Sequence, residues 1–217
     1  MSVYETLCGI LGEENVLRDE PMGAHTTFRV GGPADYFVMP QSEEALAELA
    51  AFVTKEDISH YILGNGSNLL VGDKGYRGVM IQVGRGLGEI RVDGELIYAQ
   101  AGGSLARLAA VARQESLTGL EFASGIPGTL GGAVMMNAGA YGGEMKQVIV
   151  SARALAPGGE IREIPVKKLE LGYRTSIFAA NEDIILGAVM KLEKGDKDQI
   201  QDYMDELKRR RVEKQPL

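Results

Sequence analysis

The chain has 217 residues, 45% of them hydrophobic, and a formal net charge of −7. This length and apolar content allow one large domain or two small ones with a buried core, and they argue against a disordered protein. The acidic balance argues against nucleic acid as the main partner, because a phosphate backbone requires a basic surface, so an anionic ligand would need positive charge supplied locally.

The N-terminal segment shows no sign of export or membrane insertion. Residues 1–5 have neither the basic start nor the apolar core of a signal peptide, and no run of the chain reaches the roughly 18 apolar residues of a spanning helix. Cys8 is the only cysteine, so no internal disulfide can form, and we expect it to be a buried apolar filler. These features predict a cytoplasmic protein with no membrane partner.

Residues 34–83 have the alternating pattern of a small α/β lobe. Ser42 can cap a helix whose first turn holds two glutamates and whose apolar residues fall at helical spacing. The apolar runs 61–63 and 78–83 are expected to be strands. We therefore assign residues 1–83 to an N-terminal α/β lobe.

From Ile90 onward the pattern favours antiparallel pairing. The predicted strands are the two arms of a hairpin on an Asp93-Gly94 turn, followed by residues 148–155, 161–164 and 184–192. Ser104 begins a second amphipathic helix, with apolar residues on one face. We assign residues 84–194 to a second lobe that combines an antiparallel sheet with helices.

The C-terminal segment, residues 195–217, is predicted to be an amphipathic helix capped by Asp198 and ending in the basic run 208–211. One short basic run in an acidic chain is typical of a solvated helix end that complements the helix dipole, and this interpretation is favoured over a nucleic-acid surface. The run could also attract a ligand that carries a diphosphate.

Two glycine stretches are the most informative feature of the chain. The first, residues 64–69, reads Gly-Asn-Gly-Ser-Asn-Leu, and the second, residues 125–133, reads Gly-Ile-Pro-Gly-Thr-Leu-Gly-Gly-Ala and is followed by Asn-Ala-Gly-Ala-Tyr-Gly. Because glycine lacks a Cβ and tolerates positive φ, consecutive amides can approach one bound group. An ordinary loop explains the first stretch alone equally well, and a tight turn explains part of the second. Together they favour a site for a large polyanionic cofactor.

Neither stretch matches the common nucleotide-binding fingerprints. In the first, Leu69 stands where a dinucleotide fingerprint requires its third glycine, so a Rossmann fold is disfavoured. No glycine loop ends in lysine followed by serine or threonine, as a P-loop must, so ATP hydrolysis is also disfavoured.

Four segments, taken in order, resemble the family of UDP-N-acetylenolpyruvoylglucosamine reductases. They are the two glycine stretches, residues 25–28 (His-Thr-Thr-Phe) and residues 173–178 (Tyr-Arg-Thr-Ser-Ile-Phe). The resemblance covers nearly the whole chain and implies an α+β fold, a two-lobed FAD-binding domain of the p-cresol methylhydroxylase / vanillyl-alcohol oxidase type. It also implies the reduction of UDP-N-acetylglucosamine-enolpyruvate to UDP-N-acetylmuramate by NADPH, a step in peptidoglycan precursor synthesis.

The resemblance implies noncovalent FAD, with the first glycine stretch holding the diphosphate through amides and hydroxyls and the second lining the remaining contacts. The residues assigned to this site are Gly64, Asn65, Gly66, Ser67, Asn68, Leu69, Gly125, Ile126, Pro127, Gly128, Thr129, Gly131, Gly132, Ala133 and Gly139. Some flavoproteins of this fold attach flavin through histidine, but His25 and His60 lie outside the glycine stretches, and His60 is expected to be structural. No metal site is expected.

Arg174 is the predicted catalytic residue. By resemblance to the family's tyrosine-arginine-x-serine motif, it binds the enolpyruvyl carboxylate and stabilises the enolate, a role suited to a permanently charged, forked donor. A surface arginine is the alternative. Tyr141 matches a family tyrosine that contacts substrate, and core packing with a satisfied hydroxyl explains it about as well.

The implied reaction passes a hydride from NADPH through flavin N5 to the vinyl ether, and the enolate that results must be protonated. In the family the proton donor is a serine in a glycine-serine-x-phenylalanine motif, joined by a late glutamate, and both belong to a substrate-binding domain that would follow Leu217. We therefore expect flavin binding with weak or no turnover. The alternatives are a noncatalytic FAD-binding module and a flavin oxidoreductase of the same fold with another acceptor.

Overall fold

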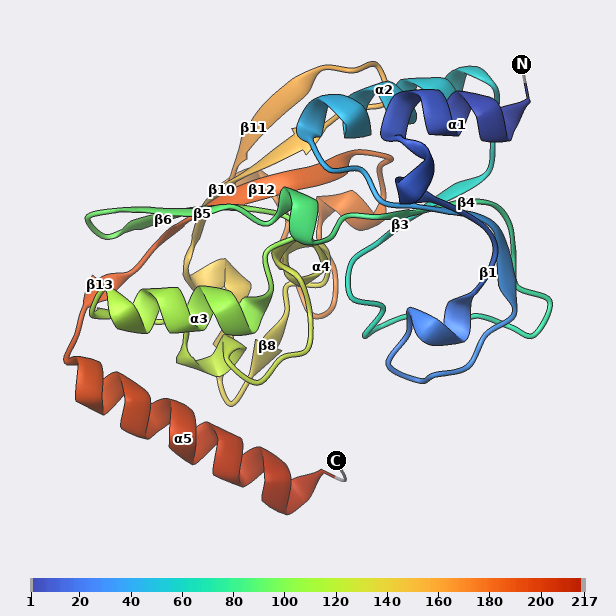
Figure 1. Cartoon of the computed structure of the whole chain (residues 1–217). Coiled ribbons are helices and arrows are strands. Elements are labelled where there is room, and N and C mark those ends of the chain that lie inside the picture. The colour runs from blue at the N-terminus through green and yellow to red at the C-terminus, as the bar shows by residue number, and fades with distance from the viewer. Residues whose placement is uncertain (1, 216–217) are drawn as a thin grey trace.

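Two main β-sheets and five α-helices make up residues 2–215, the part of the chain that the computed structural model describes (Figure 1). The helices are α1 Val3–Leu11, α2 Glu43–Lys55, α3 Leu105–Gln114, α4 Leu130–Met135 and α5 Lys197–Lys214. The strands are β1 Val16–Pro21, β2 Pro33–Val38, β3 His60–Leu63, β4 Tyr76–Gln82, β5 Ile90–Asp93, β6 Leu96–Gln100, β7 Leu117–Thr118, β8 Gly139–Ala140, β9 Gly143–Glu144, β10 Ile149–Leu155, β11 Ile161–Pro165, β12 Ile184–Lys191 and β13 Glu193–Lys194.

The first sheet has four strands in the order β1-β2-β4-β3. Strands β2, β4 and β3 run parallel and β1 runs antiparallel to β2, so the predicted β-α-β pattern around α2 is confirmed. Ser42 caps α2 as predicted, accepting from the amide of Ala45 at 3.2 Å. Helix α1 was not predicted from the sequence, although Ser2 and Glu5 form a capping box that begins it.

The second sheet has five strands in the order β11-β10-β12-β6-β5, and every pairing in it is antiparallel, as predicted. The β5–β6 hairpin turns one residue later than expected. Asp93 pairs with Leu96, so Gly94 and Glu95 form the two-residue loop, and Gly94 takes the positive φ of 61° that this turn requires.

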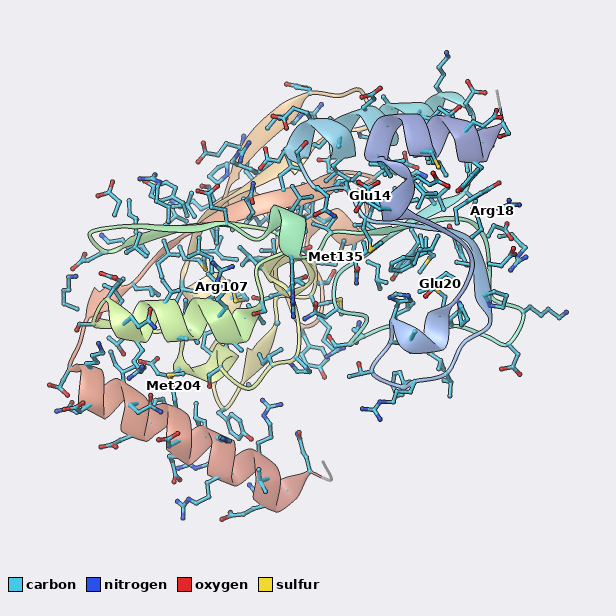
Figure 2. The ribbon with its side chains drawn as sticks, viewed as in Figure 1. Glu14, Arg18, Glu20, Arg107, Met135 and Met204 are labelled. Carbon is cyan, nitrogen blue, oxygen red and sulfur yellow. The ribbon has the colours of Figure 1, made fainter. Side chains whose placement is uncertain are left out.

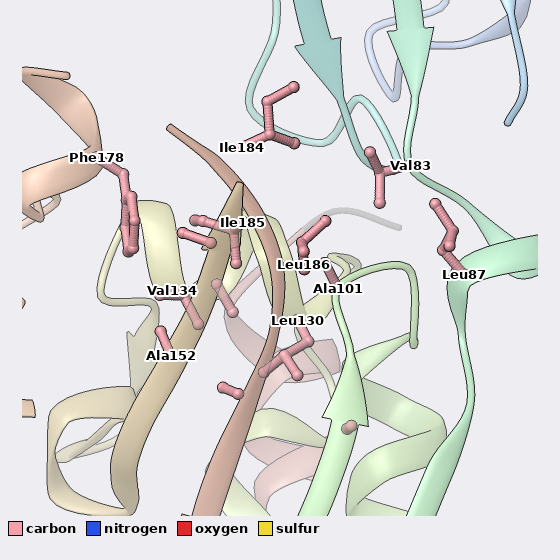
Figure 3. Packing of buried hydrophobic residues seen from close by; sticks show 14 of the residues in the cluster. Val83, Leu87, Ala101, Leu130, Val134, Ala152, Phe178, Ile184, Ile185 and Leu186 are labelled. Carbon is pink, nitrogen blue, oxygen red and sulfur yellow. The ribbon is translucent and has the colours of Figure 1, made fainter. Parts of the chain in front are cut away.

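One hydrophobic core connects the two sheets. Leu130 and Val134 of α4 pack beside Ile185 and Leu186 of β12, while Val83 lies between the sheets (Figure 3). Nearly all of β12 is buried because it is the central strand, with α4 on one face. The predicted boundaries at residues 83 and 194 stay predictions, because one hydrophobic core contains residues from both sides of residue 83 and Met204 of the C-terminal segment packs against it.

Helix α5 packs on α3 and on the short 3-10 turn Glu121–Ala123. Its buried residues are Ile200 and Leu207, and Met204 lies on the side that faces α3 (Figure 2). The predicted cap, Asp198, is wrong by two residues, because the carboxylate of Asp196 accepts from the amides of residues 198 and 199. None of the helices in residues 2–215 is long and apolar enough to span a membrane.

Cys8 is half-buried against the core rather than fully buried, a small correction to the expectation for it. His60 lies in β3, where its Nδ1 is 3.1 Å from the carbonyl of Ile58. This placement agrees with a structural role for His60.

Candidate functional site

A cavity of about 580 Å³ opens between the two glycine stretches. Its volume falls in the range of small-molecule and cofactor sites. One wall follows β3 into the first stretch, a second runs from the second stretch through α4 to β8, and the end of α5 closes a third side. The lining residues are Tyr61, Ile62, Leu63, Gly64, Asn65, Gly66, Ser67, Asn68, Leu69, Leu105, Ile126, Pro127, Gly128, Thr129, Gly132, Ala133, Met135, Met136, Ala138, Gly139, Ala140, Tyr141, Arg174, Arg211, Lys214 and Gln215.

The cavity brings together all the predicted FAD-site residues except Gly125 and Gly131, together with Tyr141 and Arg174. Gly125 faces the C-terminal helix, where a Cβ would lie 2.8 Å from Nε of Arg211. Gly131 packs on the end of β6, since its amide donates to the carbonyl of Ala101 at 2.8 Å and a Cβ would lie 3.0 Å from that residue's methyl. These two glycines allow close packing instead of lining the cavity.

The first glycine stretch offers free backbone donors. Within residues 2–215, none of the amides from Asn65 to Leu69 donates to a backbone carbonyl. Successive unpaired amides of this kind form a concave donor surface suited to an anion. A diphosphate therefore fits the chemistry of this wall.

Residues 25–27 hold the first stretch from behind, a role that the sequence analysis missed. The amide and hydroxyl of Thr27 both donate to the carbonyl of Gly66, each at 3.2 Å. Gly66 has a φ of 62°, and a Cβ there would overlap the carbonyl of His25. The His25 ring stacks on Phe37 and is 2.8 Å from a carboxylate oxygen of Glu20, which makes it structural.

The second glycine stretch is only partly a loop, because its last four residues begin helix α4. Thr129 caps this helix, its hydroxyl accepting from the amide of Gly132 at 3.4 Å. The same hydroxyl faces Gly64, whose missing Cβ lets the two stretches touch. Residues 130–133 of the second stretch are therefore helical, which the sequence did not predict.

Two glycines present bare backbone to the cavity. A Cβ on Gly128 would lie 3.8 Å from both Leu105 Cδ1 and Ser67 Oγ, and one on Gly132 would lie 3.7 Å from the hydroxyl of Thr129. The protein could accommodate a side chain at either position, but the side chain would occupy the cavity. The residues present thus fit FAD, with free amides for the diphosphate and an uncluttered surface for a flat ring.

The cavity is electropositive although the protein is acidic. Its described lining includes Arg174, Arg211 and Lys214 and no carboxylate. Arg211 and Lys214 come from the basic end of α5, so this helix end lines the cavity in addition to facing solvent. Three cations without a counterion in the wall indicate an anionic ligand.

Arg174 reaches the cavity from a tight turn. The amide of Gly172 donates to the carbonyl of Thr175 at 3.1 Å, and Arg174 takes a φ of 52°. Its guanidinium donates to the side-chain oxygen of Asn68, so the arginine spans from this turn to the first glycine stretch. Ser176 is buried, and its hydroxyl donates to the carbonyl of Met135 at 2.9 Å, which fixes the end of the turn on α4.

Tyr141 lies at the tip of the β8–β9 hairpin with a φ of 54° and is 36% exposed. The guanidinium carbon of Arg211 is 5.8 Å from its ring centroid, within the range of a cation–π contact. The packed-core alternative for Tyr141 is therefore disfavoured by its exposure.

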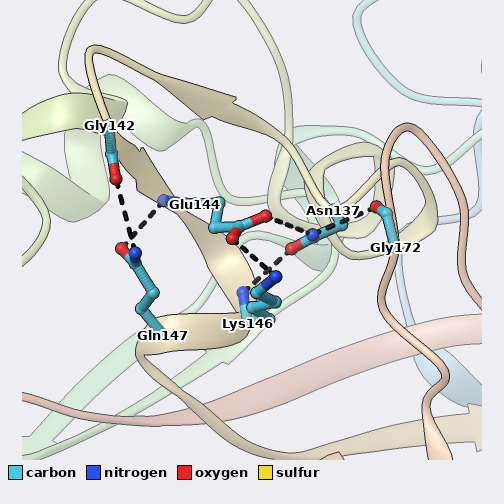
Figure 4. A network of polar contacts seen from close by, with 6 residues as sticks. All are labelled: Asn137, Gly142, Glu144, Lys146, Gln147 and Gly172. Carbon is cyan, nitrogen blue, oxygen red and sulfur yellow. Dashed lines mark hydrogen bonds and ion pairs between the residues drawn. The ribbon is translucent and has the colours of Figure 1, made fainter.

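A polar network holds the β8–β9 hairpin, which carries Tyr141 at its tip (Figure 4). The ammonium of Lys146 is 2.7 Å from the Glu144 carboxylate and lowers the pKa of that carboxyl below its ordinary 4.5, with a smaller lowering from Asn137. The Asn137 side chain donates to the same carboxylate at 2.7 Å.

The lowered pKa of Glu144 predicts a pH dependence of stability. A carboxylate whose pKa falls on folding stabilises the fold fully above its ordinary pKa of 4.5, and this contribution is lost as the pH falls through the lowered value. Urea midpoints measured between about pH 3 and pH 7 should therefore decline more steeply below pH 4.5 in the wild type than in Glu144→Gln. Equal slopes in the two proteins would contradict this.

Comparison with known proteins identifies the family. A model of an FAD binding domain matches residues 34–165. UDP-N-acetylenolpyruvoylglucosamine reductase of Clostridioides difficile is 46% identical over 215 residues, which cover 99% of this chain and 71% of the relative. The chain belongs to the UDP-N-acetylenolpyruvoylglucosamine reductase family. The reductase of Agathobacter rectalis is 48% identical over 219 residues and is covered to 69% of its length.

Solved structures agree with this membership. The UDP-N-acetylenolpyruvylglucosamine reductase of Thermus caldophilus superposes with a TM-score of 0.79 at 31% identity, covering 93% of this chain and 70% of that one. A 4-ethylphenol oxidase from Gulosibacter chungangensis shares the fold, with a TM-score of 0.65 at 15% identity and 88% of this chain covered. The predicted fold, an α+β FAD-binding domain of the p-cresol methylhydroxylase / vanillyl-alcohol oxidase type, is confirmed for this reductase family member.

Proposed function

We propose that the chain holds FAD in this cavity and serves in the NADPH-dependent reduction of UDP-N-acetylglucosamine-enolpyruvate to UDP-N-acetylmuramate. The observation that carries the proposal is the cavity lining, which combines bare glycine backbone with three cations and has no carboxylate among its described residues. Family membership supplies the reaction class. A single cysteine also fits a reducing compartment, which supports a cytoplasmic location.

The two glycine stretches would bind different parts of the cofactor. The free amides of residues 65–69 would bind the diphosphate, with the hydroxyl of Ser67 beside them. Gly128 and Gly132 would lie against the ring system, where a side chain would obstruct it. FAD, when bound, supplies the hydride chemistry of the reaction.

The cations would bind and polarise the substrate. Arg174 would bind the enolpyruvyl carboxylate with its planar fork and stabilise the negative charge that develops there. Arg211 and Lys214, which line the same cavity, would attract the diphosphate of the UDP sugar. Tyr141, on the rim beside Arg211, would contact the substrate and limit access of water.

The second half of the reaction requires a general acid at the substrate carbon. The resemblance assigns this acid to a serine in a glycine-serine-x-phenylalanine motif, which does not occur in this sequence. The two halves of the reaction must therefore be tested separately.

The visible absorption spectrum of the purified chain tests the proposal, followed by anaerobic addition of NADPH and then of the enolpyruvyl substrate. We expect a flavin spectrum that NADPH bleaches and that the substrate restores slowly or not at all without the serine-bearing segment. Flavin that NADPH never reduces, even with that segment supplied, would favour a noncatalytic FAD-binding module. Fast reoxidation by another acceptor and none by this substrate would indicate a different oxidoreductase, and failure to bind added FAD would refute the proposal.

A further inference from the structure

Asn137 connects the turn that carries Arg174 to the polar network under the β8–β9 hairpin (Figure 4). Its side-chain amide donates to the carbonyl of Gly172 at 3.1 Å, across 35 residues of sequence, and to the carboxylate of Glu144 at 2.7 Å. Its side-chain oxygen accepts from the amide of Lys146 at 2.9 Å. One buried side chain thus links two segments that both reach the cavity.

Asparagine suits this position for two independent reasons. Its φ is 40°, in the left-handed region that asparagine tolerates better than most residues. The residue is 5% exposed, and both amide hydrogens and the oxygen of its side chain have partners. Aspartate in its place would lose both donors and would set a second carboxylate against Glu144.

Beside Gly172, the Arg174 turn is held by Leu171, which packs against the core, and by the amide of Ile177, which donates to the carbonyl of Leu169 at 2.9 Å. Tyr173 is 93% exposed, and Arg174 and Thr175 are exposed as well, so burial does not hold these three residues themselves. The far end is fixed by the buried hydroxyl of Ser176. At the near end, the side chain of Asn137 holds the carbonyl of Gly172, two residues before Arg174.

We propose that Asn137 is a positioning residue that holds Arg174 at the place where it meets the substrate carboxylate. The proposal rests on the proposed function, since it takes Arg174 as the carboxylate-binding residue. A displacement of about 1 Å in a binding group of this kind is enough to weaken its action on a ligand by up to about 100-fold. Asn137 is therefore expected to govern recognition of the carboxylate without touching the ligand.

The test compares Asn137→Gly with Gln147→Ala in the full FAD-loaded chain. Glycine tolerates the positive φ, so Asn137→Gly removes the hydrogen bonds with little backbone strain. Gln147 belongs to the same network, accepting from the amide of Glu144 and donating to the carbonyl of Gly142, but among the described residues it has no hydrogen bond to Gly172, so Gln147→Ala is the matched control. Two readouts are used, amide exchange at Gly172 and the ratio of affinities for UDP-N-acetylglucosamine-enolpyruvate and UDP-N-acetylglucosamine, which lacks the carboxylate.

In Asn137→Gly we expect faster exchange at Gly172 and a fall of about tenfold in the preference for the enolpyruvyl ligand, with the affinity for UDP-N-acetylglucosamine kept within about twofold. Gln147→Ala should leave both readouts unchanged. In a double-mutant cycle, adding Asn137→Gly to Arg174→Ala should not lower the preference for the enolpyruvyl ligand any further, because both substitutions act through the Arg174 guanidinium.

Unchanged exchange and preference in Asn137→Gly would overturn the proposal. An equal loss of affinity for both ligands would also overturn it, because it would mark Asn137 as merely structural. Additive losses with Arg174→Ala would do the same. The proposed function itself would fail if Arg174→Ala kept the wild-type preference for the enolpyruvyl ligand, or if the wild type bound neither ligand. Both results are obtained without any Asn137 variant, so they are distinguishable from a failure of the Asn137 proposal.

Discussion

Gly128→Val is expected to weaken FAD binding by about 10- to 100-fold while the protein stays folded, since a few methyl groups placed in a ligand's space have effects of this size. The position is held by backbone bonds, with the amide of Leu105 donating to the Gly128 carbonyl at 3.0 Å. Its Cβ would meet neighbours only at ordinary contact distances. The added side chain would therefore occupy the cavity and leave the packing around it intact.

Titration of the apoprotein with FAD, followed by quenching of flavin fluorescence, measures this effect. Gly72→Val is the matched control, because a Cβ on Gly72 has no atom within 4 Å and the residue lies outside the cavity. The thermal midpoints of both variants without FAD should lie close to that of the wild type. Full FAD affinity in Gly128→Val would place the cofactor elsewhere.

Arg174→Ala is expected to slow oxidation of the reduced flavin by the enolpyruvyl substrate by about 100-fold, the usual cost of removing a donor from a site where negative charge develops. FAD binding and flavin reduction by NADPH should change little, because Arg174 is exposed and its partner Asn68 regains water when the guanidinium is removed. The substitution should therefore affect only the half of the reaction in which the substrate becomes an enolate.

Single-turnover absorbance at the flavin band, in the chain extended by the serine-bearing segment, separates the two halves. Arg174→Lys is the informative companion, since lysine keeps the charge and loses the planar fork, and it should fall between the wild type and the alanine variant. Oxidation at the wild-type rate in Arg174→Ala would remove this residue from the mechanism.

The elements that could be predicted from the sequence are those with local signals. Ser42 and Ser104 cap α2 and α3 where the sequence places them, and the turn between β10 and β11 follows from adjacent proline and glycine. Helix α4 was missed because two of its six residues are glycine, which disfavours helix. It forms because Thr129 caps it and its apolar side chains are buried against β12.

The site was harder to predict because its parts meet only after the sheets dock. The sequence does not distinguish Gly131, which packs against β6, from Gly128, which faces the cavity, since the difference depends on neighbours distant in sequence. Arg211 reaches the cavity only because α5 packs on α3 with its basic end beside the β8–β9 hairpin. The contact of Asn137 with Gly172 has no local signal for the same reason.

The wall contributed by α5 has a consequence for biosynthesis. The cavity is lined by residues from Tyr61 to Arg211, Lys214 and Gln215. The ribosome therefore adds about 150 residues between the first and the last of these segments, which takes on the order of 10 s at usual rates of synthesis. Until α5 emerges from the ribosome, the side of the cavity that this helix closes is open and the cations of α5 are absent. The cofactor is therefore expected to load only after α5 has been synthesised and has packed on α3, and not onto a nascent chain that lacks this helix.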